Sequence, residues 1–76
     1  MKFYDCTTAP SPRRVRIFMA EKQISVDTVQ VDLRNGEQHS EAFRAINPRC
    51  TVPVLELPDG SHLSEALAIC WYLERR

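Results

Sequence analysis

One proline, placed directly before a short apolar run, constrains the fold of this chain more than any other residue. Pro53 precedes Val54 to Leu57, a run that is typical of a β-strand. Proline has no amide hydrogen to donate, so it occurs at the first residue of a strand or at a sheet edge. Two geometries fit here: a trans Val52-Pro53 bond that simply starts a strand, or a cis bond, which is the uncommon isomer that only X-Pro bonds adopt cheaply. In the cis form the main-chain groups of Val52 would face sideways, where an extended peptide can dock as an added strand.

Length and charge limit the functions open to the chain. Its 76 residues allow one domain with one small core. Ten acidic and ten basic residues give a net charge of zero, which argues against a nucleic-acid partner. The N-terminus does not resemble a signal peptide, and no stretch is long enough to span a membrane. Cys6, Cys50 and Cys70 are too few for a disulfide scaffold and fit a reducing, cytoplasmic setting, and no metal-ligand spacing is present.

Periodicity and turn residues predict an α/β domain with the order strand, helix, strand, helix, strand, strand, helix. Strands are expected at 2–5, 25–33, 54–57 and 61–64, and helices from about residue 12, over 40–46 and after residue 64. Ser11 and Ser64 are the predicted N-caps of the first and last helices. The first strand, helix and strand form a βαβ unit, whose strands pair in parallel. We therefore expect one four-stranded mixed sheet with helices on both faces.

Four stretches of the chain together carry a family resemblance. They are PRRVRIFMAEK (12–22), Asn47-Pro48, TVPVL (51–55) and LSEALAICWYL (63–73). These stretches resemble the N-terminal domain of cytosolic, bacterial-type glutathione S-transferases, and the resemblance runs over essentially the whole chain. It implies the thioredoxin-like fold, βαβ-α-ββα, with residues 1–76 as the glutathione-binding domain, and it favours the cis form of Val52-Pro53. It also implies a homodimeric transferase whose all-helical C-terminal domain lies outside these residues.

The resemblance places a glutathione site beside Pro53 and at the start of the last helix. It implies that the main chain of Val52 pairs with the cysteinyl part of glutathione, and that Glu65 and Ala66 hold the γ-glutamyl end. A helix N-terminus offers free amides and partial positive charge to a carboxylate. The Glu65 side chain would meet the ammonium group, although it could instead only complement its own helix dipole. The family usually has Ser where this chain has Ala66, so we expect weaker glutathione binding, unless Ser64 compensates.

Other polar residues lie where relatives often hold the glycyl carboxylate of glutathione. These candidates are Gln38, His39 and Arg49. A solvated polar face is the alternative role for each of them.

The sequence leaves open which group activates the sulfur atom of glutathione. By resemblance the catalytic position falls at Ala9, which cannot donate a hydrogen bond to a thiolate. Thr8 and Ser11 are the candidate catalytic donors, with helix capping as the alternative role of Ser11. A helix N-terminus and one donor lower the pKa of a thiol, which makes glutathione a nucleophile toward a small electrophilic substrate. In the family the electrophile pocket is built largely by the C-terminal domain, so we predict that residues 1–76 alone bind glutathione weakly and catalyse poorly.

Two other functions remain open. A non-catalytic interaction module of the same fold is favoured by Ala9 and Ala66. A glutaredoxin-like thiol-disulfide oxidoreductase needs a cysteine at the start of the first helix, and residues 9–12 supply none. Cys6 lies earlier in the chain and is expected to be buried in the core. Tyr4 is expected to be a strand residue that packs against a helix. The basic side chains of the first helix are expected on its solvated outer surface, and they are Arg13, Arg14 and Arg16.

Overall fold

A four-stranded sheet forms the middle layer of the computed structural model, which describes residues 1–75. Its strands are β1 (Lys2–Asp5), β2 (Asp27–Gln30), β3 (Val54–Glu56) and β4 (His62–Leu63), in the order β2-β1-β3-β4. β1 pairs in parallel with β2 and antiparallel with β3, and β3 pairs antiparallel with β4. The predicted mixed sheet is confirmed.

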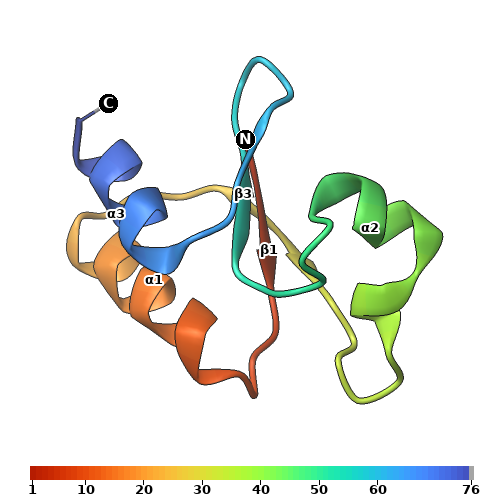
Figure 1. The fold of residues 1–76 in the computed structure, drawn as a ribbon. Helices are drawn as coiled ribbons and strands as arrows, with labels where there is room; N and C mark the ends of the chain where they lie inside the picture. The colour runs from red at the N-terminus through yellow and green to blue at the C-terminus, as the bar shows by residue number, and fades with distance from the viewer. Residues whose placement is uncertain (76) are drawn as a thin grey trace.

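Helices cover both faces of this sheet (Figure 1). α1 (Pro10–Glu21) and α3 (Ala66–Arg75) lie together on one face. α2 (Glu41–Ile46) lies on the other face, directly after a short 3₁₀ turn, η1 (Glu37–His39), that the sequence did not predict. The layered thioredoxin-like arrangement expected from the resemblance is therefore present.

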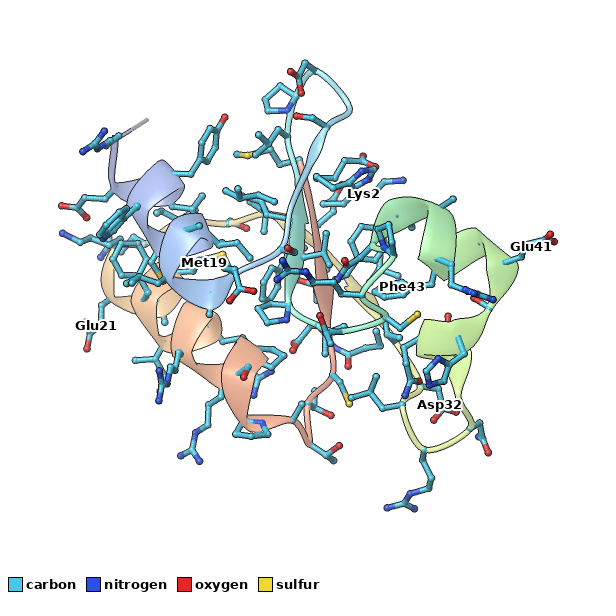
Figure 2. The ribbon with its side chains drawn as sticks, in the orientation of Figure 1. Lys2, Met19, Glu21, Asp32, Glu41 and Phe43 are labelled. Carbon is cyan, nitrogen blue, oxygen red and sulfur yellow. The ribbon has the colours of Figure 1, made fainter. Side chains whose placement is uncertain are left out.

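The alternation of side chains along β1 and β3 divides the core into two clusters. Successive residues of a strand point to opposite faces. Phe3 and Leu55 accordingly pack toward α1 and α3, while Tyr4 and Val54 pack toward α2. The first cluster also holds Val15, Met19, Ile69 and Leu73, and the second also holds Cys6, Val31, Phe43 and Val52. Figure 2 shows Met19 and Phe43 on opposite sides of the sheet. The Tyr4 and Phe43 rings meet edge to face at 6.1 Å, so the packing roles predicted for Tyr4 and Cys6 are confirmed.

The predicted capping role of Ser11 is wrong. α1 begins at Pro10, its N-cap is Ala9 in an extended conformation, and no side chain caps it. The reason is that the fixed φ of Pro10 suits the first helical position, where no amide hydrogen is needed. Ser11 therefore lies inside the first turn, exposed to solvent.

The predicted capping role of Ser64 is also wrong. α3 begins at Ala66, and the Ile69 amide donates to the Glu65 carbonyl oxygen at 2.8 Å. Glu65 is thus the residue that precedes the helix, and Ser64 lies one position too early.

β2 is shorter than the predicted strand at 25–33. Its only partner is β1, which offers four residues for pairing. After Gln30 the Val31 amide still donates to the Asp5 carbonyl oxygen at 2.7 Å, and then the chain turns away. The length of an edge strand is set by its neighbour, which β propensity alone does not reveal.

Candidate functional site

Three segments meet at the end of the sheet where β1 finishes and β3 begins. Tyr4 is the partner of Val54 in the antiparallel ladder, so the chain after β1 lies beside the chain before β3. The Ala9 amide donates to the Cys6 carbonyl oxygen at 3.0 Å, and this turn leads directly into α1. Ala9 packs on the same apolar cluster as Val52. The structure therefore brings the predicted catalytic position next to the segment that precedes Pro53.

The main chain of Val52 is free at this place. The Val52-Pro53 bond is cis, and the Val52 side chain is buried. Over residues 1–75 the ladder between β1 and β3 stops at Val54, and neither the amide nor the carbonyl of Val52 takes part in a hydrogen bond. An unpaired main-chain donor and acceptor at a strand end can accept an added extended peptide.

Asn47 holds the loop that presents Val52. Its buried side-chain amide donates to the Thr51 carbonyl oxygen at 2.9 Å and lies 3.1 Å from the Thr51 hydroxyl. Its Oδ1 accepts from the Arg49 amide at 3.1 Å. Cys50, between them, has a positive φ of 58°. One side chain thus bonds the loop on both sides of Cys50.

Glu65 and Ala66 lie at the start of α3, as expected for the γ-glutamyl end of the predicted site. The Glu65 carboxylate is 71% exposed and lies 3.1 Å from the Arg49 guanidinium, which is equally exposed. Such exposed pairs contribute at most about 1 kcal/mol, so a ligand ammonium can compete with Arg49 for the carboxylate. The first amides of a helix have no intrahelical acceptor, and those of α3 remain available to an anion. Arg49, a predicted candidate for the glycyl carboxylate, thus lies beside Glu65 at the start of α3.

Gln38 and His39 lie in η1, on the α2 side of the sheet. His39 is exposed. The Gln38 Oε1 atom is buried and has no hydrogen-bond partner among the described residues. A glycyl carboxylate would need the Nε2 donor of Gln38, since two acceptor oxygens cannot pair.

The start of α1 carries few hydrogen-bond donors for a sulfur atom. Pro10 and Pro12 occupy the first and third helical positions and have no amide hydrogen. The Ala9 amide is already bound to Cys6. Only Ser11 offers a free amide in this turn, together with its exposed hydroxyl. Of the two predicted catalytic donors, Ser11 is therefore at the helix start, while the Thr8 hydroxyl lies 3.3 Å from the Cys6 sulfur.

The contact with Thr8 alters the chemistry of Cys6. Hydrogen bonds from the Thr8 side chain and then its amide hold the pKa of the Cys6 thiol below its ordinary value, against the opposing effect of burial. Cys70, in contrast, has its pKa raised by burial. Sequence reasoning missed the Thr8 contact because it depends on the geometry of the turn between β1 and α1.

A groove of about 500 Å³ opens beside this turn. Its lining comes from two loops, namely Cys6, Thr7 and Thr8 after β1 and residues 30–35 at the end of β2. Asp32 and Arg34 give it one charge of each sign, and a hydrogen bond from the Asn35 side chain lowers the pKa of Asp32.

Within residues 1–75 no group of three or more His, Cys, Asp or Glu side chains is placed to hold a metal ion, and no helix is long and apolar enough to cross a membrane.

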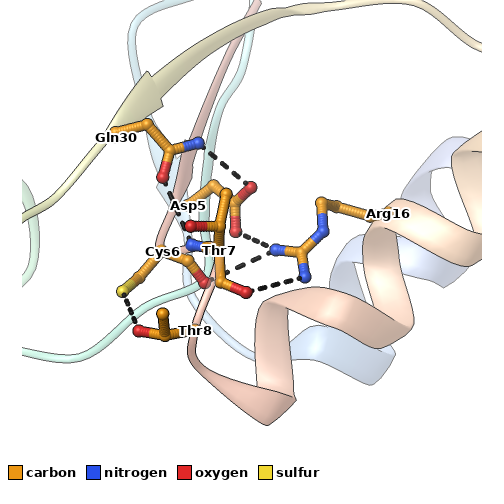
Figure 3. A network of polar contacts seen from close by, with 6 residues as sticks. All are labelled: Asp5, Cys6, Thr7, Thr8, Arg16 and Gln30. Carbon is orange, nitrogen blue, oxygen red and sulfur yellow. Dashed lines mark hydrogen bonds and ion pairs between the residues drawn. The ribbon is translucent and has the colours of Figure 1, made fainter.

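The prediction of a solvated role for Arg16 is wrong. Its guanidinium forms an ion pair with Asp5, whose side chain is 1% exposed, and makes long contacts of 3.5 Å to the carbonyl oxygens of Cys6 and Thr7 (Figure 3). Gln30 donates to Asp5 at 3.4 Å and accepts from the Thr7 amide at 3.2 Å. An acidic residue at the end of a central strand is the signal that could have indicated a buried cationic partner.

Comparison with protein families and curated proteins finds relatives over nearly the whole chain. The family model for "Glutathione S-transferase, N-terminal domain" matches residues 8–76. Glutathione S-transferase 2 of Saccharomyces cerevisiae is 45% identical over 76 residues, which cover 97% of this chain and 33% of that protein. The chain spans about a third of the length of the first curated relatives it matches.

Comparison with solved structures also finds relatives over nearly the whole chain. A glutathione S-transferase domain-containing protein of Marinobacter aquaeolei matches with a TM-score of 0.93 and 48% identity, over 99% of this chain and 38% of that one. A maleylacetoacetate isomerase of Methylobacterium extorquens, solved with bound malonate and GSH, matches with a TM-score of 0.92 and 42% identity, over 97% of this chain and 35% of that one.

Proposed function

Because the chain belongs to the glutathione S-transferase N-terminal domain family, we propose that it is the glutathione-binding domain of a glutathione transferase. The observation that carries this proposal is the unpaired main chain of Val52 at the same end of the sheet as the start of α1. The fold alone would not support a glutathione-binding function, since one fold serves many functions.

Glutathione binds mainly through main-chain groups in this proposal. Its cysteinyl part pairs with the amide and carbonyl of Val52 as a short added strand. Its γ-glutamyl carboxylate lies at the free amides of α3, and its ammonium group replaces Arg49 beside Glu65. Ala66 contributes an amide but no hydroxyl. Gln38 and His39 stay candidates for the glycyl carboxylate.

The sulfur atom lies at the start of α1, where Ser11 is the proposed donor. The amide and the hydroxyl of Ser11 can both stabilise a thiolate, and the helix dipole adds to this effect. Thr8 is the second candidate, since it directly precedes Ala9, the N-cap of α1. Once the thiolate is formed, the protein needs only to position the electrophile.

We further propose that the small electrophilic substrate and the homodimer interface involve an all-helical region beyond these residues. Relatives three times as long support this, and so does the outer face of α3. Leu67 and Trp71 lie one turn apart on that face and are 66% and 62% exposed, although they are apolar. Cytoplasmic location is part of the same proposal. Residues 1–76 alone should then bind glutathione weakly and turn over little.

Calorimetric titration of the full-length protein with glutathione, followed by a conjugation assay with chlorodinitrobenzene, tests the function. Binding with turnover is expected. Binding without turnover favours the non-catalytic interaction module, and reduction of a glutathione mixed disulfide without conjugation favours the glutaredoxin-like alternative. Absence of any glutathione binding overturns the proposal.

A further inference from the structure

A buried carboxylate at the end of β1 organises the segment that leads into α1. Asp5 is almost completely buried, and a buried charge is retained only when it is paired and hydrogen-bonded. Its two oxygen atoms are taken by Arg16 from α1 and by Gln30 from β2. One side chain at the end of a central strand is therefore tied to two other elements.

The same two partners also hold the main chain of the next residues. Arg16 reaches the carbonyl oxygens of Cys6 and Thr7, and the Gln30 Oε1 atom accepts from the Thr7 amide. Figure 3 shows the guanidinium and the amide on either side of this segment, with Thr8 at its end beside Cys6. Both peptide groups flanking Thr7 are thus bound by side chains that are themselves held by Asp5.

This segment ends at the proposed sulfur site. Thr8 is followed by Ala9, the N-cap of α1, and by Pro10 and Ser11 in the first turn. A displacement of about 1 Å in such a segment can lower a rate by about 100-fold. Among the described residues, Val52 and Glu65, which are proposed to hold the rest of glutathione, share no hydrogen bond with Asp5, Arg16 or Gln30.

We propose that Arg16 and Gln30 are positioning residues, which act through Asp5 to set the Cys6–Thr8 segment and thereby the site where the glutathione sulfur is activated. This inference rests on the proposed function for its catalytic consequence. The placement of the segment itself can be tested without glutathione.

The experiment compares four variants of the full-length protein. Gln30→Met removes both bonds of Gln30 from an exposed position, so the fold should tolerate it, and Thr28→Met on the same strand is its control. Arg16→Lys keeps the charge but loses the two-pronged guanidinium, and Arg14→Lys on the exposed face of α1 is its control. Far-ultraviolet circular dichroism checks that each variant is folded.

Two readouts are used. The first is the pH midpoint of Cys6 alkylation, followed by mass spectrometry in the absence of glutathione. Gln30→Met and Arg16→Lys should raise this midpoint, because Thr8 moves away from the sulfur. Asp32 and Arg34, the charged groups that share the groove with Cys6, are unchanged in every variant. The second readout is conjugation, in which kcat should fall about 10- to 100-fold while the glutathione Kd stays within about twofold.

The outcomes separate the two proposals. If the unmodified protein does not bind glutathione, the proposed function fails, and the alkylation midpoint still tests the positioning of the segment. If both variants keep the Cys6 midpoint of their controls, the positioning role is wrong. If the midpoint rises but kcat does not change, the network is structural only and the inference is overturned.

Discussion

The side-chain amide of Asn47 donates to the main-chain carbonyl oxygen of Thr51 at 2.9 Å and lies 3.1 Å from its hydroxyl. Asn47 ends α2, and Thr51 directly precedes the free main chain of Val52. The position of the proposed peptide-binding edge is therefore set by a buried polar side chain, in addition to the apolar packing of Val52.

Replacing Asn47 by Ala should destabilise the protein and weaken glutathione binding. The change leaves the Thr51 carbonyl and the Arg49 amide without their partner, and an unsatisfied buried group costs about 1–3 kcal/mol. Urea denaturation measures the loss, and Asn35→Ala in an exposed loop is the control. Equal unfolding free energies for the two variants would contradict the role given to Asn47.

Replacing Glu65 by Gln should weaken glutathione binding with little effect on stability. The variant loses a charged hydrogen-bond acceptor for the ammonium group, which is worth about 1.5–3 kcal/mol, or roughly 10- to 150-fold in Kd. Its contact with Arg49 is exposed and contributes little to folding. Titration calorimetry measures the affinity. Glu74→Gln, which removes an exposed pair with Lys22 near the other end of α3, should leave the Kd unchanged.

Replacing Ala66 by Ser should strengthen glutathione binding. The hydroxyl restores a donor to the γ-glutamyl carboxylate, and a hydrogen bond to a charged group contributes about 1.5–3 kcal/mol. The same calorimetric titration gives the change in Kd. Ala68→Ser, one half-turn further along α3, provides the control for the altered helix propensity. An Ala66→Ser affinity no better than that control would show that the carboxylate does not lie at the start of α3.

Replacing Thr8 by Val should raise the pKa of the Cys6 thiol. The hydrogen bonds of Thr8 favour the thiolate, so the pKa of Cys6 lies below its ordinary value in the folded protein. A lowered pKa adds stability only above the ordinary thiol pKa, and this contribution disappears as the pH falls through the lowered value. Thr8→Val should therefore cost more stability in alkaline than in neutral buffer. The pH midpoint of alkylation measures the shift, and Cys70, whose pKa is raised by burial, serves as the internal reference.

The sequence predicted those parts of the fold that depend on local pattern. Phe3 and Tyr4 alternate in a strand, and Pro58 to Gly60 form the tight turn, in which the Leu57 amide donates to the Ser61 carbonyl oxygen at 2.8 Å. The predicted cap at Ser11 was wrong because Pro10 moved the start of α1 ahead of it. Local capping preferences do not include this competition between serine and proline.

The parts of the site that depend on long-range contacts could not be predicted. Helical spacing places Arg16 on α1, but it does not reveal that the central strand ends in a buried carboxylate close to it. The contact between Thr8 and Cys6 depends on the turn between β1 and α1. The positions of Val52 and Glu65 in the fold, by contrast, could be predicted from motifs in the chain. Proteins that share such motifs also share the three-dimensional arrangement of the segments that contain them.

The most direct test of the central claim is the amide nitrogen-proton spectrum of the full-length protein during a titration with glutathione. If glutathione lies between the free edge at Val52 and the starts of two helices, the amide signals of Val52, Ala66 and Ser11 should shift and saturate together. The Gly60 amide, in the turn between β3 and β4, should stay in place. Unchanged Val52 and Ala66 signals at saturating glutathione would contradict the account.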